Sequence, residues 1–330
     1  MIWDVGVGLR VLVTGGCGFV GSHLVDALLN GGFQVRVVDD LSGGRLENVK
    51  RWEGNAGFEL VVGDLRDVAV AERSVEGVGL VFHLAANPDV RLGSVEPRVH
   101  FDENLVVTFN VLEALRKCGG VGRVVFASTS TVYGEAKVFP TCEDYGPLLP
   151  ISVYGGAKLG CEALIASYCH SFGFEAVLLR FANIVGSRAR HGVVVDFVRK
   201  LREKPGELRV LGDGSQCKSY LHVSDLVDAF FAVMKSFGKS GRVEAYNVGS
   251  LDKVSVVRIA EIVCEELSLA RPRFRFDASV EGGRGWKGDV KTMLLSVDKL
   301  LGLGWRPRLN SEEAVRRSCR ELLGSMEVVG

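Results

Sequence analysis

The stretch TGGCGFVG, Thr14–Gly21, decides the fold, and half of its residues are glycine. An apolar run, Leu9–Val13, precedes it, and Ser22–Leu29 has the pattern of a helix. A strand, a glycine-rich turn and a helix N-terminus together form the setting that binds dinucleotide phosphates. The glycines fit two registers, G-x-x-G-x-x-G from Gly15 and G-x-G-x-x-G from Gly16. Because glycine-rich turns are common, the spacing of a second element has to support this interpretation.

That second element is the run Gln34–Val38, which predicts a strand and ends in Asp39 and Asp40. Dinucleotide sites use an acidic side chain about 20 residues beyond the glycines to hold the adenosine ribose, and this carboxylate repels the extra phosphate of NADP. We therefore predict that Asp39 binds the ribose of NAD, with Asp40 beside it. Arg45 leaves NADP as the less favoured cofactor.

Length, charge and cysteine spacing exclude several classes of protein. The 330 residues suffice for one large or two modest domains, and the formal net charge is zero. Balanced charge argues against nucleic-acid and anionic-membrane partners, and no apolar run reaches the ~18 residues of a spanning helix. None of the eight cysteines forms a C-x-x-C pair, so we predict no metal site. Without a recognisable signal peptide, the expected location is the cytoplasm.

The first half of the chain alternates strand-like and helix-like segments. Such alternation predicts an α/β fold, a doubly wound Rossmann-type parallel sheet, and ligands of these sheets bind at the carboxyl ends of the strands. Further strands are expected near 58–62, 80–84, 123–127 and 176–180, and helices near 20–30, 103–117 and 154–172. We predict an NAD-binding domain over 1–182, with a returning strand near 243–249. Residues 183–330 are predicted to form mostly a smaller, C-terminal substrate-binding domain.

A tyrosine and a lysine on one predicted helix are candidates for acid–base chemistry. Tyr154 and Lys158 are four residues apart and therefore share a helix face. A phenol ordinarily ionises only near pH 10, and a neighbouring ammonium stabilises the phenolate. Thr129, at the end of a predicted strand, could hydrogen-bond the same substrate hydroxyl. A surface Tyr–Lys pair would be the simpler interpretation if the glycine stretch did not accompany it.

Thr14–Gly21, Ser128-Thr129 and Tyr154-x-x-x-Lys158 resemble motifs of the extended short-chain dehydrogenase/reductase family. Within that family the chain is most similar to the UDP-glucose 4-epimerases, also called UDP-galactose 4-epimerases, especially those of archaea. The similarity runs nearly from end to end. The other segments that carry it are Val38–Ser42, Gly63–Leu65, His83–Ala86, Glu103–Leu105, Gly212–Gln216, Lys287–Asp289 and Leu303–Pro307.

The resemblance implies a role in binding NAD for residues along the first half of the chain. Asp39 would hold the adenosine ribose and Lys158 the nicotinamide ribose. Asp64 and Leu65 would flank the adenine. The remaining implied contacts to NAD come from Gly15, Gly18, Phe19, Val20, Gly21, Asp40, Ala85, Ala86, Asn104 and Tyr154.

The resemblance also implies a site for a UDP-sugar. Tyr154 would be the acid–base and Thr129 would order the substrate hydroxyl, while Asn183 would contact the diphosphosugar. The other implied substrate contacts are Gly192 and Val193 at the uracil, and Lys218, Asp289 and Met293. Lys218 and Trp286 replace arginines of the family pattern, and Arg284 is a further candidate cation.

The implied reaction is inversion at C4 of UDP-glucose or UDP-galactose through a transient 4-ketosugar. Dehydratases and UDP-glucuronate decarboxylases of the family carry acids after the Ser-Thr pair, where this chain has Ser130 and Thr131. We reject dehydration on that ground and disfavour decarboxylation. An epimerase of UDP-N-acetylhexosamine or UDP-glucuronate, or a UDP-glucuronate decarboxylase, remains an alternative. Met293 bears on the first of these, because it leaves room for an N-acetyl group at C2. A non-catalytic NAD-binding relative is a further alternative. Members of the family commonly pair through two helices, so a homodimer is expected.

Overall fold

A computed structural model describes residues 9–119, 122–238, 241–270 and 272–327, and these divide into two compact units. Unit 1 contains the described residues within 9–128, 157–179 and 233–245, and unit 2 contains those within 129–156, 180–232 and 246–327. The chain passes from one unit to the other within single strands and helices. It leaves unit 1 after Ser128, after Leu179 and after Ala245.

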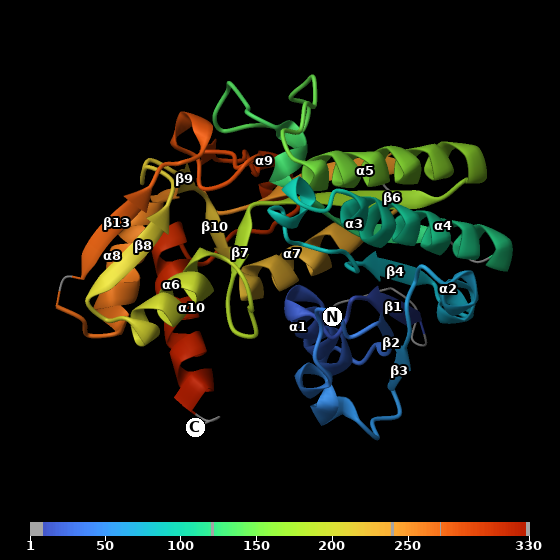
Figure 1. The fold of residues 1–330 in the computed structure, drawn as a ribbon. Helices are drawn as coiled ribbons and strands as arrows, with labels where there is room; N and C mark the ends of the chain where they lie inside the picture. Colours follow the sequence, from blue (N-terminus) through green and yellow to red (C-terminus); the bar gives the residue numbers. More distant parts are fainter. Residues whose placement is uncertain (1–8, 120–121, 239–240, 271, 328–330) are drawn as a thin grey trace. The chain divides into compact units, whose positions relative to one another are not determined.

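Unit 1 is built on the predicted α/β sheet (Figure 1). Seven strands lie in the order β11, β6, β5, β4, β1, β2 and β3, which is the doubly wound order with β11 added beside β6. Strand β1 pairs in parallel with β2 and β4, β2 pairs with β3, and β4 with β5. The strands are β1 (Arg10–Thr14), β2 (Gln34–Asp39), β3 (Phe58–Val62), β4 (Leu80–His83), β5 (Arg123–Thr129), β6 (Glu175–Phe181) and β11 (Val243–Val248). The predicted returning strand is therefore part of the central sheet.

The interior of the sheet is apolar because β1, β2, β4 and β5 are rich in buried valine, leucine and phenylalanine. Helices α4 and α5 run side by side (Figure 1), and the side chains of Tyr168 and Glu113 are hydrogen-bonded between them. The helical elements are α1 (Phe19–Asn30), η1 (Leu46–Asn48), η2 (Lys50–Trp52), α2 (Val68–Val75), η3 (Leu92–Ser94), α3 (Arg98–His100), the π-helical η4 (Phe101–Val106), α4 (Val107–Cys118) and α5 (Val153–Phe172).

The sequence predicts one helix over 103–117, whereas the structure has a π-helical segment followed by α4. A π-helical turn contains one residue more than a regular α-helical turn. The carbonyl of Asn104 accepts a backbone N–H at the end of this segment and also the side-chain hydroxyl of Thr108 at 2.7 Å. Apolar periodicity alone does not reveal such an insertion.

Unit 2 packs three helices, α6, α8 and α10, around a second apolar core that includes Phe197, Ile259 and Val315. Its strands form small sheets, in which β7 pairs with β10, β9 with β12 and β14, and β8 with β13. Its helical elements are η5 (Ser130–Tyr133), α6 (Val193–Glu203), α7 (Val223–Met234), α8 (Val256–Glu266), η6 (Glu281–Gly283), α9 (Asp298–Leu301) and α10 (Ser311–Glu327). The strands are β7 (Asn183–Val185), β8 (Glu207–Leu211), β9 (Cys217–Lys218), β10 (Tyr220–His222), β12 (Val254–Ser255), β13 (Arg273–Asp277) and β14 (Thr292–Met293).

A buried carboxylate in α7 organises the segment Leu303–Pro307, which carries part of the family resemblance. Asp225 is 1% exposed, and its carboxylate accepts hydrogen bonds from the backbone N–H groups of Arg308 and Leu309. The guanidinium of Arg308 donates to the same carboxylate at 2.7 Å, and the indole of Trp305 donates to the backbone carbonyl of Asp225. This acceptor therefore fixes the turn that leads into α10.

Replacing Asp225 should destabilise unit 2 much more than replacing its exposed neighbour. Asp225→Ala leaves the two backbone donors without an acceptor, at an expected cost of about 2–3 kcal/mol. Asp228→Ala is the matched control, because Asp228 pairs with the same Arg308 at 2.8 Å but its side chain is 53% exposed. The control should cost less than about 1 kcal/mol. Urea denaturation of both variants measures the difference, and equal costs would contradict the role of Asp225.

Candidate functional site

The glycine loop between β1 and α1 has the geometry of a phosphate cradle. Gly15 has a φ of 68°, and a Cβ atom there would lie 2.9 Å from the backbone nitrogen of Ala85. A Cβ on Gly21 would lie 2.2 Å from the carbonyl oxygen of Gly15. The N-cap residue of α1, Gly18, provides no side-chain cap, and the first turn contains no acidic residue. The N-terminal N–H groups of α1 therefore remain suited to an anion.

Asp39 lies at the end of β2 and is held against this loop. Its carboxylate accepts hydrogen bonds from the backbone N–H groups of Cys17 and Leu41, each at 2.9 Å. Burial raises the pKa of Asp39, and the two N–H bonds oppose this shift. A carboxylate has about four acceptor positions, so two remain for ribose hydroxyls. Asp40, in contrast, is exposed and accepts from Ser42.

The predicted adenine-flanking pair lies at the end of β3. Asp64 is bound by the guanidinium of Arg66 at 2.7 Å, and this hydrogen-bonded pairing lowers the pKa of Asp64. Leu65 is 5% exposed, and the amide of Asn110 in α4 donates to its carbonyl oxygen. These contacts hold the β3–α2 turn on α4.

A series of buried hydrogen bonds supports the turn after β4, where Ala85 and Ala86 lie. The hydroxyl of Thr14 accepts from the N–H groups of Leu84 and Ala85, so it must donate its own proton to Nδ1 of His83 at 2.8 Å. Nε2 of His83 then carries the proton toward the hydroxyl of Thr108 at 3.0 Å. Burial lowers the pKa of His83 to about 3, so the imidazole is neutral.

Asn104, in the π-helical segment, extends this series of buried hydrogen bonds. It is 1% exposed, its side-chain oxygen accepts from the backbone N–H of Asn87 at 2.7 Å, and its amide nitrogen approaches the ring of His100 at 3.3 Å. The side chain thereby orders the loop that follows β4. Its predicted contact with NAD stays a prediction.

In unit 2, Thr129 and Tyr154 belong to two turns that approach each other closely. Thr129 ends β5, and its hydroxyl accepts from the backbone N–H of Thr131 at the start of η5. Ser152 caps α5 by accepting from the N–H of Gly155, the residue after Tyr154. A Cβ on Gly155 would lie 2.9 Å from the carbonyl oxygen of Thr131. Only glycine therefore permits this approach between η5 and the first turn of α5.

Lys158 lies on α5 one turn beyond Tyr154, as predicted, and is only 3% exposed. Its ammonium donates to the carbonyl oxygen of Ala127 at 2.8 Å and lies 4.7 Å from the ring centre of Phe126. Burial lowers the pKa of Lys158 to about 8, against the opposing influence of Cys161 and Glu162. Its contacts with the nicotinamide ribose and with the phenol of Tyr154 stay predictions.

Two of the predicted substrate residues in unit 2 bind each other. The ammonium of Lys218 and the carboxylate of Asp289 are 2.6 Å apart, and Asp289 is 2% exposed. The ammonium also lies 5.3 Å from the ring centre of Trp286, where the family pattern has an arginine. Arg284, the alternative cation, is paired with Glu135 and with the backbone of Asp289.

The remaining predicted substrate residues lie on short elements of unit 2. Asn183 begins β7, and its amide donates to the carbonyl of Ser219. Gly192 is the N-cap of α6 with a φ of 103°, and Val193 is the first residue of that helix. Met293 lies in β14 and is 8% exposed.

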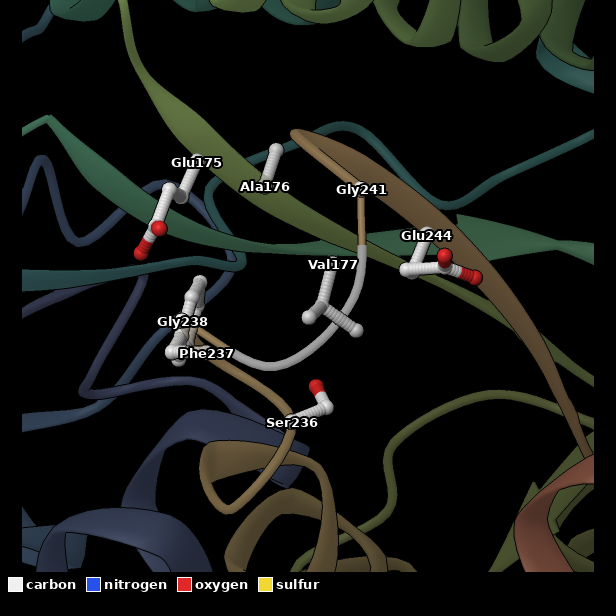
Figure 2. Close-up of a pocket in the computed structure, with 8 residues that line it drawn as sticks. All are labelled: Glu175, Ala176, Val177, Ser236, Phe237, Gly238, Gly241 and Glu244. Carbon is white, nitrogen blue, oxygen red and sulfur yellow. The ribbon is translucent and has the colours of Figure 1, made fainter.

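A small pocket in unit 1 is a poor candidate for this site. It is lined by residues at the amino ends of β6 and β11 and in the loop after α7, among them Glu175, Phe237 and Glu244 (Figure 2). Ligands of doubly wound sheets bind at the opposite, carboxyl edge. Among the described residues no cluster of three metal-ligating side chains occurs, and no helix is long and apolar enough to span a membrane.

Comparison with known proteins assigns the family. The model of the NAD dependent epimerase/dehydratase family matches residues 11–249. The chain belongs to this family. It is 32% identical to a putative UDP-glucose 4-epimerase of Methanocaldococcus jannaschii over 93% of this chain and 96% of that one. A solved UDP-galactose 4-epimerase is 48% identical over 96% of this chain and all of that one, with a TM-score of 0.86.

The family also contains relatives named for other reactions. UDP-glucuronic acid decarboxylase 1 of Danio rerio is 32% identical, over 96% of this chain and 73% of that one. The residues of unit 1 nevertheless fit NAD, because the glycine loop excludes side chains and Asp39 retains free acceptor positions. Sequence reasoning missed the supports of this site, Thr14, His83 and Glu162. Thr14 and His83 are polar residues at the ends of apolar segments, whereas Glu162 lies within α5 and has no such signal.

A methyl group at Gly21 should weaken NAD binding. The added Cβ would collide with the backbone of Gly15, and such overpacking costs about 1–3 kcal/mol. The expected loss in affinity for Gly21→Ala is therefore roughly tenfold to hundredfold, measured by NAD titration. Gly43→Ala is the control, because a Cβ at Gly43 meets nothing within 4 Å. Unchanged affinity in Gly21→Ala would contradict the cradle.

Proposed function

We propose that this protein is an NAD-dependent epimerase that inverts C4 of a UDP-hexose, UDP-glucose or UDP-galactose. One observation carries the proposal: Tyr154 and the buried ammonium of Lys158 share one face of α5, and the carbonyl of Ala127 holds that ammonium at the carboxyl end of β5. The family membership and the fit of the glycine loop and Asp39 to NAD support it.

The proposed mechanism assigns each proton and each binding contact to a residue of this chain. Tyr154, as phenolate, takes the proton of the sugar 4-hydroxyl, while Thr129 orders that hydroxyl. NAD, held by the glycine loop, Asp39 and Lys158, would supply reversible hydride transfer at C4 of the sugar, which permits inversion through the 4-ketosugar. Lys158 holds the nicotinamide ribose and stabilises the phenolate of Tyr154. The 4-ketosugar must rotate between the loss and the return of the hydride. The protein therefore has to hold the UDP group firmly and the sugar loosely.

We propose that residues of unit 2 bind the UDP part of the substrate. Lys218 supplies a cation for the diphosphate, with Asp289 orienting its ammonium. Asn183 contacts the diphosphosugar, and the backbone around Gly192 and Val193 meets the uracil. We further propose that residues 1–182, with the returning strand, bind NAD, and that 183–330 bind mostly the UDP-sugar.

The residues of η5 favour epimerisation over elimination or decarboxylation. Ser130 and Thr131 begin η5 directly after Thr129, at the positions where the dehydratases and decarboxylases of the family carry acids. Neither hydroxyl acts as a general acid near neutral pH. A second candidate function is epimerisation of a UDP-N-acetylhexosamine. Met293 favours it, because methionine is flexible and leaves space for a group at C2.

Replacing Tyr154 should abolish turnover without releasing NAD. Tyr154→Phe removes the hydroxyl that accepts the proton, and loss of a general base costs about 10²- to 10⁴-fold in rate. Chromatography of UDP-galactose and UDP-glucose after incubation, without added NADH, measures the reaction. NAD content of the purified variant is the control for the cofactor site.

The same assay with UDP-N-acetylgalactosamine and UDP-glucuronate distinguishes the two candidate functions. Conversion of the N-acetyl sugar alone would support the second candidate, and release of carbon dioxide from UDP-glucuronate would indicate a decarboxylase. Substantial epimerisation by Tyr154→Phe would contradict the assigned role. A wild-type protein that converts none of these sugars would indicate a non-catalytic relative.

We also propose that the protein is a cytoplasmic homodimer. Phe101 and Phe109 on η4 and α4 and Phe172 on α5 are each about half exposed, with exposed fractions of 54%, 45% and 51%. Exposed aromatic rings on neighbouring helices are typical of an interface between subunits. Light scattering at micromolar concentration should give twice the mass of the 35.7 kDa chain. Phe101→Glu with Phe109→Glu should shift it to the monomer, and a monomeric wild type would contradict the proposal.

A further inference from the structure

Two hydrogen bonds join consecutive residues of β5 to α5. One of them is made by Lys158, which with Tyr154 forms the proposed catalytic pair. The ammonium of Lys158 donates to the carbonyl of Ala127 at 2.8 Å. The hydroxyl of the next strand residue, Ser128, donates to the carboxylate of Glu162 at 2.5 Å. Lys158 and Glu162 are one helical turn apart, so the two bonds fix the register of α5 on β5 at two successive points.

Glu162 places a carboxyl group in the interior of unit 1, one helical turn from Lys158. Its residue is 4% exposed, and Ser128 and Lys158 are 2% and 3% exposed. Burying a carboxylate or an ammonium alone is costly, whereas burying an opposite pair returns part of that cost. A leucine at this position of α5 would fill the same space without the free-energy cost of burying a carboxyl group. We therefore expect the carboxyl group of Glu162 to have a role.

The groups that act on the ammonium of Lys158 come from three elements. Glu162 and the thiol of Cys161 lie on α5 itself, His83 comes from β4, and His100 comes from α3. His83 is neutral because burial lowers its pKa, and burial also lowers the pKa of His100. Burial raises the pKa of the Cys161 thiol, which keeps it protonated. Of this set, Glu162 carries the carboxyl group, and it lies one helical turn from Lys158 on the same face of α5.

We propose that Glu162 is a positioning residue that keeps Lys158 charged in the interior and, through Ser128, holds α5 in register on β5. The proposal rests on the proposed function, in which the Lys158 ammonium stabilises the phenolate of Tyr154. Glu162 touches neither substrate nor cofactor in this scheme. It acts by maintaining the charge of the residue that does.

The decisive variant removes the charge of Glu162 and keeps its shape. Glu162→Gln retains an oxygen that accepts from Ser128 but has no negative charge. In protein labelled at lysine Cε, the NMR titration of Lys158, assigned with Lys158→Met, should fall from pH 8 by about one to three units. Ser128→Ala is the matched control, because it removes the hydrogen bond and leaves the carboxylate. It should leave the titration within about half a unit.

Turnover as a function of pH provides the second readout. Since the ammonium is present only below the pKa of Lys158, the alkaline limb of kcat should move to lower pH in Glu162→Gln and by the same interval as the NMR titration. A folded Glu162→Gln whose Lys158 titrates as in the wild type would overturn the proposal. The NMR measurement does not need turnover, so it still decides the matter if the proposed function is wrong.

A variant that does not fold is also informative. If Glu162→Gln is unfolded, the double variant Lys158→Met with Glu162→Gln removes both buried charges. Recovery of folding in the double variant would support the charge pair, because an unpaired ammonium was then the cause of the defect. Continued failure to fold would show that Glu162 serves packing alone and would overturn the proposal.

Discussion

The ammonium of Lys158 is buried in unit 1, and much of the surrounding structure depends on keeping it there. Burial disfavours the charged form, so an interior lysine needs acceptors and opposite charge close by. The carbonyl of Ala127 and the ring of Phe126 provide two such contacts from β5. Burial also keeps His83 neutral, and the hydroxyl of Thr14 fixes the tautomer of this ring, which links β4 to Thr14 and Thr108.

Close backbone contacts impose a second constraint on the same region. Gly15 allows the loop after β1 to lie against the turn after β4, Gly21 allows α1 to approach that loop, and Gly155 allows α5 to approach η5. Hydrogen-bonded side chains then hold each turn in place, Asp39 for the glycine loop and Ser152 for the start of α5. The site is thus made of turns that a rigid sheet brings together and that small residues allow to touch.

The sequence predicts the sheet well because its signals are local. Apolar runs bounded by glycine mark β1, β2 and β5, and the spacing from Gly15 to Asp39 follows from a strand, turn and helix of ordinary length. The supporting network was not predictable in the same way. Glu162 lies in an apolar segment of α5, and its partner Ser128 comes from a strand 34 residues away along the chain.

The same limit applies to unit 2 and to the π-helical segment. Nothing in the spacing of Lys218 and Asp289 shows that they pair across 71 residues, because that contact depends on how β9 and the loop after η6 pack. The extra residue in η4 leaves the apolar pattern of 103–117 nearly intact, so the sequence reads as one regular helix. Long-range packing, and not local preference, decides such features.

The repeated passage of the chain between the two units restricts how the protein can be divided. Each unit contains three separate segments of the chain, and β5, β6, β11, α5 and α7 all cross the division. A gene fragment ending near residue 182 would omit β11 and leave β6 as an uncovered sheet edge. Cutting the chain within any one of these five elements would interrupt a strand or helix that both units share.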